Sequence, residues 1–554
     1  MNSASNIIVT TSFNFSMKPS FDVLVIGSGH NGLITACMLA KQGYKVKVIE
    51  RRDTIGGAVC TETMFESEKY PKGFQMDVGS SAHVMIHQTG IVEELELEKY
   101  GLEYIDMDPF MSYPIYGKEG VIHFYRDIEK TLESIRKVSP SDVDNYREFL
   151  EFWEKINKGV IRTFMMPPKT GSIVMEMMKG QFRDGAMFKK GEQLQGLQKI
   201  LGSYGEVVNN QFDSEALKTA ILWFAAQSGP TPDQAATGDF AGWQAMLHKS
   251  GVKHPRAGSG MLTQAMKKML EAHGGEVIAD SPVKEILVEG GKAVGVVTED
   301  ETEHRARIVV SNAHVQTTML ELLGPDHLPS SMIKAVENIN VGNGFGMVIR
   351  AAVEELPNYT SAPNDPEIHN GLQLLCPDQD FMHRAIGDYQ KKEPPQQPPV
   401  VAMTFSKIDE DVAPSGGHTL FAWAQWHPYE LANGQKWDEI REREAQKIYD
   451  VVADYAPNIK DKRIDWYIQS PLDIERKHGL KKGNVMHVEM SFNQMFMFRP
   501  TPELGQYRTP VKNLYLSSAS CHPGGGVFGA AGYNAFQTIM KDEGKKFKKL
   551  EPRV

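Results

Sequence analysis

A short glycine-rich segment constrains the fold more than any other feature of this sequence. The residues FDVLVIGSGHNGLITACMLAKQGYKVKVIERRD read as a buried strand from Phe21 to Ile26, a glycine turn, a helix, and a second strand that ends at Glu50. The turn carries G-x-G-x-x-G spacing at Gly27, Gly29 and Gly32. Strand, glycine turn, helix and strand in this order predict a Rossmann-like dinucleotide-binding unit rather than an isolated flexible turn.

Each residue of this unit has a physical reason at its place. Gly27 permits the sharp turn, Gly29 lets a pyrophosphate approach the backbone, and Gly32 lets the helix pack closely on the strand. The free N–H groups around Ser28 and the dipole of the helix favour an anion there. Glu50 closes the second strand, where a carboxylate can accept hydrogen bonds from the adenosine ribose. All five residues are therefore predicted to bind the cofactor.

The residues that follow distinguish between dinucleotides. The segment ERRDTIGGAVCTE places Arg52 two residues after Glu50 and the pair Gly56 and Gly57 shortly beyond, in a loop that can fold over a diphosphate. With G-S-G-H-N-G-L and E-R-R-D-x-x-G-G, the sequence resembles the FAD-dependent phytoene desaturase-like family. That family includes the bacterial carotenoid desaturases, the O-type carotenoid ketolases and the pyridine nucleotide-disulfide oxidoreductase domain-containing protein 2 group. The resemblance implies FAD as the cofactor.

The resemblance extends from about Phe21 to Lys541 and adds further site residues. Val283 falls where members of the family place a backbone contact on the adenine. The C-terminal stretch NLYLSSASCHPGGGVFGAAGYNAF resembles the segment that closes over the flavin, so Gly525, Gly526 and Val527 are expected to bind the cofactor. His522 in the same stretch is our candidate catalytic residue. Its alternative role is to satisfy local backbone groups in a tight turn.

The expected fold is α/β, a Rossmann-like FAD-binding domain of the amine oxidase/desaturase type with a large inserted substrate domain. Residues 127–253 show helical periodicity, and residues 332–480 contain strand-like stretches. We expect a flexible N-terminus (1–20), three parts of the FAD-binding domain (21–126, 254–331 and 481–541), a helical insertion that faces substrate or membrane (127–253), a substrate domain (332–480) and a basic tail (542–554).

Composition excludes several other classes. A formal net charge of −10 argues against nucleic acid as a partner. The four cysteines lie far apart with no C-x-x-C pair, so we expect neither a metal site nor a disulfide framework. The segment VGNGFG at 341–346 precedes a strand instead of opening a helix, so no second dinucleotide site is expected.

Three segments bear on substrate and location. Trp423, Trp426, His427 and Tyr429 could form an aromatic wall for a polyene, or they could be sheet core. The methionine- and phenylalanine-rich residues 175–188, together with the tail KKFKKL at 545–550, suggest weak contact with anionic lipid; ordinary core packing and a solvated chain end are the alternatives. No apolar run reaches the length of a membrane span, and no secretory signal is recognisable. We expect a cytoplasmic protein, peripheral on a membrane at most.

The resemblance implies an oxidoreductase that transfers hydride from a hydrophobic small molecule, a carotenoid or another polyisoprenoid, to FAD. Quinone or oxygen is the expected electron acceptor. An O-type carotenoid ketolase and a flavin-bound regulatory or interaction protein remain alternatives. In the hydride-transfer mechanism the flavin would supply most of the chemistry, which agrees with a sequence that shows no catalytic triad or acid pair.

Overall fold

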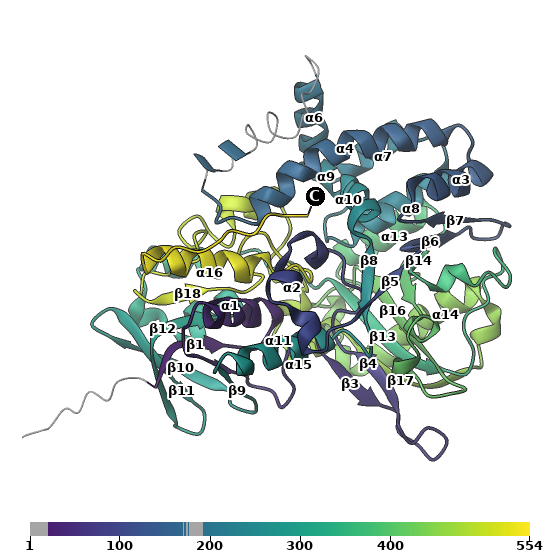
Figure 1. Cartoon of the computed structure of the whole chain (residues 1–554). Coiled ribbons are helices and arrows are strands. Elements are labelled where there is room, and N and C mark those ends of the chain that lie inside the picture. The colour runs from purple at the N-terminus through teal and green to yellow at the C-terminus, as the bar shows by residue number, and fades with distance from the viewer. Residues whose placement is uncertain (1–19, 170, 173–174, 177–191, 554) are drawn as a thin grey trace, which may run out of the picture.

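The computed structural model describes residues 20–169, 171–172, 175–176 and 192–553. Two seven-stranded sheets form the framework, with a helical layer above the second sheet (Figure 1). The first sheet has the strand order β10-β11-β12-β1-β2-β9, and β18 pairs with β12. Its strands are β1 (Phe21–Ile26), β2 (Val46–Ile49), β9 (Glu276–Ile278), β10 (Val283–Glu289), β11 (Lys292–Thr298), β12 (Glu303–Ser311) and β18 (Leu514–Leu516).

The first sheet is parallel at its centre, where β1 lies between β2 and β12. Val23, Leu24 and Val25 are fully buried, as expected for a strand covered on both faces. Helix α1 (His30–Lys41) follows β1 directly, and α11 (Met261–Ala272) and α16 (Ala530–Asp542) pack beside it. The predicted strand, glycine turn, helix and strand are thus present, and β18, the glycine turn and α16 form the predicted C-terminal unit.

Helices α1 and α16 touch at a glycine. A Cβ on Gly532 would lie 2.2 Å from the carbonyl oxygen of Asn31, so only glycine allows this approach. The Gly532 N–H donates to Asn31 Oδ1 at 3.2 Å, and Thr35 Oγ1 donates to the Gly532 carbonyl at 2.9 Å. The first and last helices of the FAD-binding unit are therefore joined by polar contacts as well as by packing.

The second sheet has the order β17-β13-β16-β15-β14-β6-β7. Its strands are β6 (Met111–Pro114), β7 (Val121–Phe124), β13 (Gly346–Val353), β14 (Leu372–Leu375), β15 (Val400–Met403), β16 (His418–Gln425) and β17 (Arg463–Gln469). Helix α14 (Trp437–Tyr455) covers one face. Strands β6 and β7 lie inside the range expected for the FAD-binding domain, yet β6 pairs with β14. Local sequence marks them as strands but carries no information about a distant partner.

The described residues of the range 127–253 are mostly helical, as the periodicity of the sequence indicates. They form α3 (Ile128–Val138), α4 (Asp142–Phe164), α6 (Glu192–Leu201), α7 (Tyr204–Gln211), α8 (Glu215–Ala226), α9 (Gly238–Gly242) and α10 (Gln244–Ser250), before β8 (Val252–Pro255). Trp153 and Trp223 anchor this layer and are fully buried in a core shared with the second sheet. Of the methionine-rich segment, Met175 is exposed, and residues 177–188 lie outside the described residues.

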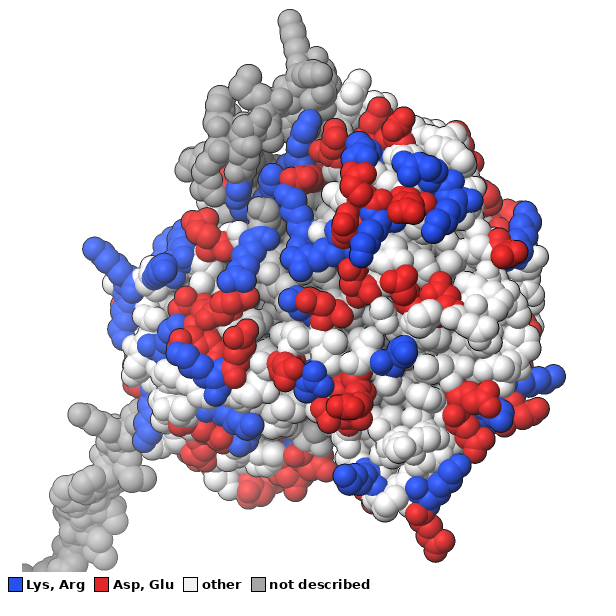
Figure 2. Space-filling view, turned by 45° about the vertical axis from the view of Figure 1, so that its right-hand side comes forward, with Lys and Arg blue, Asp and Glu red and all other residues white. Residues whose placement is uncertain are grey.

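Shorter elements complete the chain. They are α2 (Ile91–Glu94), α12 (Ser330–Glu337), α13 (Gln379–Gln390), α15 (Pro471–His478), and the two-stranded pairs β3 (Thr61–Met64) with β4 (Phe74–Asp77) and β5 (Tyr104–Met107) with β8. No helix among the described residues is long and apolar enough to cross a membrane. On the face shown in Figure 2, basic and acidic side chains are intermingled. Ion pairs join many exposed side chains of the structure, for example Arg476 with Asp438 at 2.7 Å.

Candidate functional site

A cavity of about 880 Å³ runs from the glycine turn after β1 into the space beside the second sheet. Nine of the residues predicted to bind the cofactor line it: Gly27, Gly29, Glu50, Arg52, Gly57, Val283, Gly525, Gly526 and Val527. The N-terminal and C-terminal motifs therefore face one space. Ser28, Gly32, Gly56 and His522 are not among the residues that line this cavity.

The Glu50 carboxylate is held in place by the glycine turn. Its Oε2 accepts from the Ser28 N–H at 2.8 Å and from Ser28 Oγ at 2.6 Å, and its Oε1 accepts from the Arg52 N–H at 3.0 Å. Ser28 Oγ in turn accepts from the Gly56 N–H at 2.9 Å. Glu50 is only 4% exposed but lines the cavity, so its orientation is fixed before any ribose arrives. Ser28 and Gly56 do not line the cavity, but their hydrogen bonds hold the Glu50 carboxylate in position.

Asn312 explains part of the glycine pattern, and sequence reasoning missed it. A Cβ on Gly29 would lie 2.5 Å from Asn312 Nδ2, and a Cβ on Gly32 would lie 2.8 Å from Asn312 Cβ and 2.6 Å from the Gly27 carbonyl oxygen. Asn312 directly follows β12 and lines the cavity. The sequence did contain a signal for Asn312. A polar residue at the carboxyl end of a buried parallel strand lies at the edge where such sheets bind ligands.

The part of the cavity lined by the predicted cofactor-binding residues is called the cofactor cradle below. The C-terminal glycine turn forms its opposite wall. Gly526 has φ +87° and nothing within 4 Å of the place of its missing Cβ, so the backbone there borders open space. The turn is held by Arg499, whose fully buried guanidinium donates to the carbonyls of Ala519 at 3.0 Å and Met486 at 2.6 Å. Arg499 thereby ties the turn to the loop around Met486, which also lines the cavity.

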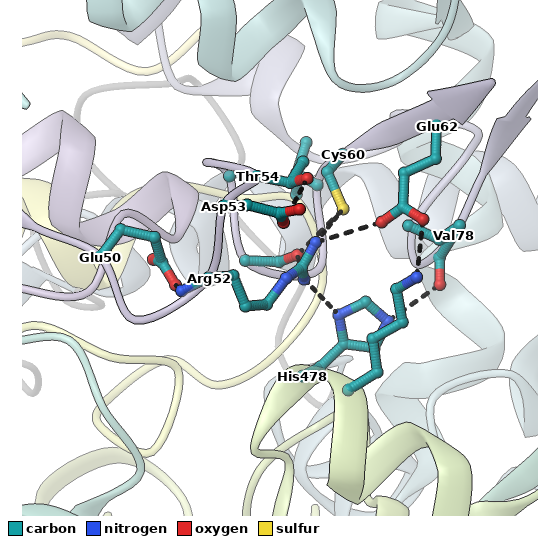
Figure 3. Close-up of polar contacts among 12 residues, drawn as sticks. Glu50, Arg52, Asp53, Thr54, Cys60, Glu62, Val78 and His478 are labelled. Atoms are coloured by element: carbon teal, nitrogen blue, oxygen red, sulfur yellow. Dashed lines mark hydrogen bonds and ion pairs between the residues drawn. The ribbon is translucent and has the colours of Figure 1, made fainter. Parts of the chain in front are cut away.

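The side chain of Arg52 joins the cofactor loop to α15 (Figure 3). Its Nη1 donates to the Gly57 carbonyl at 3.0 Å and to His478 Nδ1 at 3.2 Å, and its Nη2 contacts Cys60 Sγ at 3.4 Å and Glu62 Oε1 at 3.3 Å. The Nε2–H of His478 then donates to a backbone carbonyl at 3.0 Å, which fits a neutral imidazole. Burial lowers the pKa of His478 to about 3. The observed contacts of the Arg52 guanidinium thus shape the loop.

His522 lies in the turn and away from the cavity. It is fully buried, its Nε2 lies 3.0 Å from the Thr163 carbonyl oxygen, and its own carbonyl accepts from Tyr507 Oη at 2.5 Å. Burial lowers its pKa to about 4. These contacts support the alternative role that the sequence left open, in which His522 satisfies local backbone groups. Its catalytic role stays a prediction.

Four histidines line the cavity: His30 just after the glycine turn, His478 on α15, and the pair formed by His314 and His487. The rings of His314 and His487 stack with centroids 5.8 Å apart, and His314 Nε2 donates to the His487 carbonyl at 2.9 Å. His487 has φ +66°, an unusual backbone conformation for a residue other than glycine. Burial lowers the pKa of both members of the pair, that of His314 to about 4, so both rings are neutral at pH 7. Neither histidine of the pair lies in a sequence motif that assigns it a role.

Beyond the cradle the cavity becomes an apolar chamber. Its wall combines the helical layer, the second sheet and the loop before β18: Phe224, Trp243, Leu247, Phe345, Leu372, Val401, Met403, Phe421, Trp423 and Met490. Of the aromatic residues considered for a wall, Trp423 lines the chamber, whereas Trp426 and His427 are buried and do not line it. Tyr429 is half-buried and does not line it either. The sequence left these two outcomes open, and both occur.

The residues present fit a flavin dinucleotide. Backbone without side chains borders the space at Gly29 and Gly526, a fixed carboxylate stands at the end of β2, and the N-terminus of α1 points to the same space. No group of three or more metal-ligating side chains occurs among the described residues.

Comparison with known proteins identifies the family. The model of the family described as flavin containing amine oxidoreductase matches residues 32–355, more than half of the chain. The chain belongs to this family. It is therefore an FAD-dependent oxidoreductase with the Rossmann-like FAD-binding fold that the sequence predicted.

Several curated proteins resemble nearly the whole chain. Pyridine nucleotide-disulfide oxidoreductase domain-containing protein 2 of Rattus norvegicus is 30% identical over 96% of each chain. A limonene dehydrogenase component of Castellaniella defragrans is 27% identical over 96% of each chain. Phytoene desaturase (lycopene-forming) of Pantoea ananas is 25% identical over 93% of this chain and 97% of its own. The resemblance to the phytoene desaturase-like group is confirmed.

A solved structure agrees on the fold. An oxidoreductase from Methanosarcina mazei superposes with a TM-score of 0.61 at 18% identity and covers 94% of this chain and 100% of its own. At this identity the likeness concerns the architecture alone. It supports the arrangement of an FAD-binding sheet beside a second large sheet.

Proposed function

We propose that this chain is a dehydrogenase of a long hydrophobic molecule, a carotenoid or another polyisoprenoid, and that it introduces a double bond in the manner of a desaturase. One observation carries the proposal: the cofactor cradle and the apolar chamber form one continuous cavity. A chain that fills the chamber would reach the cradle along a wall that is mostly apolar. Burial of such a chain contributes about 0.8 kcal/mol for each CH₂ group.

The chain's own residues would bind, orient and exclude water. The rings of Phe421 and Trp423 offer flat apolar surface to a polyene, and Met486 and Met490 adapt to an irregular shape. His314 and His487 present neutral rings, so they add no charge that would repel an apolar chain. Bound FAD supplies the hydride acceptor. Since the cofactor supplies this chemistry, few protonic side chains are needed.

The names of the relatives support a substrate of this class. Phytoene desaturase and limonene dehydrogenase are named for isoprenoid hydrocarbons. These names belong to those proteins, and here they support a proposal. For the electron acceptor we propose a quinone or oxygen, because the sequence contains a single dinucleotide fingerprint.

The test is anaerobic reduction of the FAD-loaded protein by acyclic polyisoprenoids such as phytoene. We expect loss of the flavin absorbance near 450 nm with about one new double bond per FAD, detected by mass spectrometry as a loss of two hydrogens. NADH and NADPH should leave the flavin oxidised, and added quinone should restore it. Products that gain oxygen would indicate a ketolase. Absence of reduction by every polyisoprenoid tried would contradict the proposal and favour a regulatory or interaction role.

We also propose weak peripheral contact with anionic lipid. Exposed Leu194, Leu197 and Leu201 follow one side of α6, and Met175 is exposed nearby in the sequence. The basic tail is partly docked on the protein, since the Phe547 ring packs against Phe536 at 5.1 Å, but its neighbouring lysines are exposed. Flotation with anionic liposomes at low and high salt tests the contact. Binding at low salt that is lost at high salt is expected, and absence at low salt would contradict it.

A further inference from the structure

A buried arginine in the wall of the cavity forms no ion pair with an acidic side chain among the described residues. Arg350, on β13, is 1% exposed, and no carboxylate of a described residue lies within 4.0 Å of its guanidinium. Burial lowers its pKa to about 10, so it is still charged at pH 7. A buried charge without a counter-charge is costly, and proteins that keep one usually pair it with a ligand or with a dense set of hydrogen bonds.

The hydrogen bonds of Arg350 use only part of its donors. Its Nε donates to the Asp77 carbonyl, Nη1 donates to Gln469 Oε1 at 2.5 Å, and Nη2 donates to the Gly79 carbonyl at 3.3 Å. A guanidinium has five N–H donors, one on Nε and two on each Nη. Among the described residues, one N–H on Nη1 and one on Nη2 are left without an acceptor. These are the two nitrogens that bind a carboxylate in a forked pair.

The guanidinium lies against the apolar chamber. It stacks on the Phe421 ring at 5.0 Å, and Arg350, Phe421, Gln469 and Gly79 all line the cavity. Two acidic side chains, Asp77 and Glu62, lie in the wider surroundings of Arg350. The Asp77 carboxylate accepts from Thr61 Oγ1 at 2.6 Å and from a backbone N–H at 2.8 Å.

The second acid is also engaged elsewhere. Glu62 pairs with Arg52 at 3.3 Å and with Lys477 at 2.7 Å. Both carboxylates are therefore held by other partners, and neither is within ion-pair distance of Arg350.

Arg499 shows what a purely structural buried arginine looks like in this chain. Its Nε, Nη1 and Nη2 donate to six backbone carbonyls: those of Met486, Val488, Glu489, Gln494, Ala519 and Cys521. It does not line the cavity. Arg350 differs from Arg499 in both respects, because it lines the cavity and has donors to spare.

We propose that Arg350 binds a carboxylate at one end of the hydrophobic substrate, so that this chain acts on a long apolar acid in preference to a plain hydrocarbon. The inference rests on the proposed function and narrows its substrate class. The Arg350 fork would hold the carboxylate at the sheet wall, while the apolar chain lies along Phe421 and Trp423. One anchored end also fixes which carbon–carbon bond of the chain reaches the cradle.

The test compares an acyclic C20 polyprenoid acid, geranylgeranoic acid, with its methyl ester, which has the same chain and no charge. Retention by the FAD-loaded protein is measured by ultrafiltration at pH 7.5. We expect the wild-type protein to hold the acid about 10- to 100-fold more tightly than the ester, the range of a charge-assisted hydrogen-bonded pair. This comparison needs no variant, so it stands even if changes at Arg350 impair folding.

Variants then assign the preference to one residue. Arg350→Gln should lose the preference for the acid and keep ester binding within about twofold, whereas Arg350→Lys should keep only part of it, because lysine lacks the fork. Lys481→Gln is the matched control, since Lys481 also lines the cavity but pairs with Glu321 at 2.6 Å. It should leave the preference unchanged.

The possible outcomes distinguish a failure of the Arg350 proposal from a failure of the proposed function. Equal binding of acid and ester by the wild-type protein would overturn the role of Arg350 and leave the apolar chamber, and so the proposed function, intact. A preference that survives in a folded Arg350→Gln protein would also overturn it. Retention of neither ligand by the FAD-loaded protein would count against both proposals.

Discussion

Asn312 Nδ2 lies 2.5 Å from the position that a Cβ on Gly29 would occupy. Gly29 is therefore restricted from two sides, by the space a pyrophosphate needs and by a side chain at the end of β12. The two residues follow β1 and β12, strands that are far apart in the sequence and pair in parallel. The glycine and the asparagine together define the floor of the cofactor cradle.

We expect Gly29→Val to empty the FAD site. The added side chain would collide with Asn312 and enter the path of the pyrophosphate, so FAD affinity should fall at least about 10-fold, or about 1.4 kcal/mol. Flavin absorbance per mole of purified protein measures the effect. The control is Gly387→Ala in α13, where no atom lies within 4 Å of the new Cβ. Full flavin occupancy in Gly29→Val would contradict this account of the cradle.

We expect the planar guanidinium group of Arg52, and not only its positive charge, to be required for FAD binding and stability. Arg52→Lys keeps the charge but cannot contact Gly57, Glu62 and His478 together, so the loop that carries Gly57 should loosen. We expect weaker FAD binding and a lower melting temperature, with Arg52→Met about as severe. Thermal unfolding with and without added FAD measures both effects. If Arg52→Lys behaves like the wild type, the network of Figure 3 contributes little.

His522→Gln should lower stability and FAD occupancy together. The imidazole contacts the Thr163 carbonyl at 3.0 Å inside a fully buried turn, and loss of such a contact costs about 1 kcal/mol. Chemical denaturation and flavin content are the measurements. A variant that keeps its stability and its FAD but is reduced slowly by substrate would show instead that His522 takes part in the chemistry.

Buried neutral histidines should make the fold sensitive to acid. Burial lowers the pKa of His427 to about 4, below its value of about 6.5 in the unfolded chain, so the unfolded state binds more protons between these values. Stability is therefore full above pH 6.5 and falls as the pH drops towards 4, by up to about 1.4 kcal/mol per pH unit for this group.

Replacing the histidine should flatten that dependence. In His427→Gln the free energy of unfolding should depend less steeply on pH across this window. The slope should fall by up to about 1.4 kcal/mol per pH unit, the contribution of one proton. His383→Gln is the control, because the His383 side chain is 44% exposed. Denaturant titrations at pH 7.0, 6.0 and 5.0 decide the matter. An unchanged slope in His427→Gln would show that this imidazole is not the source.

The cofactor cradle could be predicted well because its sequence signals are local. The strand from Phe21 to Ile26, the helix after Gly29 and the acid at Glu50 all lie within thirty residues, and their order specifies one known unit. Helical periodicity likewise predicted the helices that the structure describes between Ile128 and Ser250.

What the sequence could not predict depends on distant contacts. The pairing of β6 with β14, the position of Asn312 under the glycines, and the Arg350 guanidinium in the chamber wall each join segments more than 200 residues apart. A period of two in a strand says which side chains share a face but not which sheet receives them. His522 illustrates the converse problem, since its place in a glycine-rich turn suggested chemistry and the structure shows backbone contacts.

The contact between Asn31 and Gly532 joins residues 501 positions apart. At a synthesis rate of about 5 to 20 residues per second, α1 waits roughly 25 to 100 s before α16 has been made. Throughout that interval the apolar face meant for α16 has no partner. The FAD cradle is thus completed only after translation has passed its last glycines. A message truncated before Gly525 would yield a product that cannot enclose the cofactor.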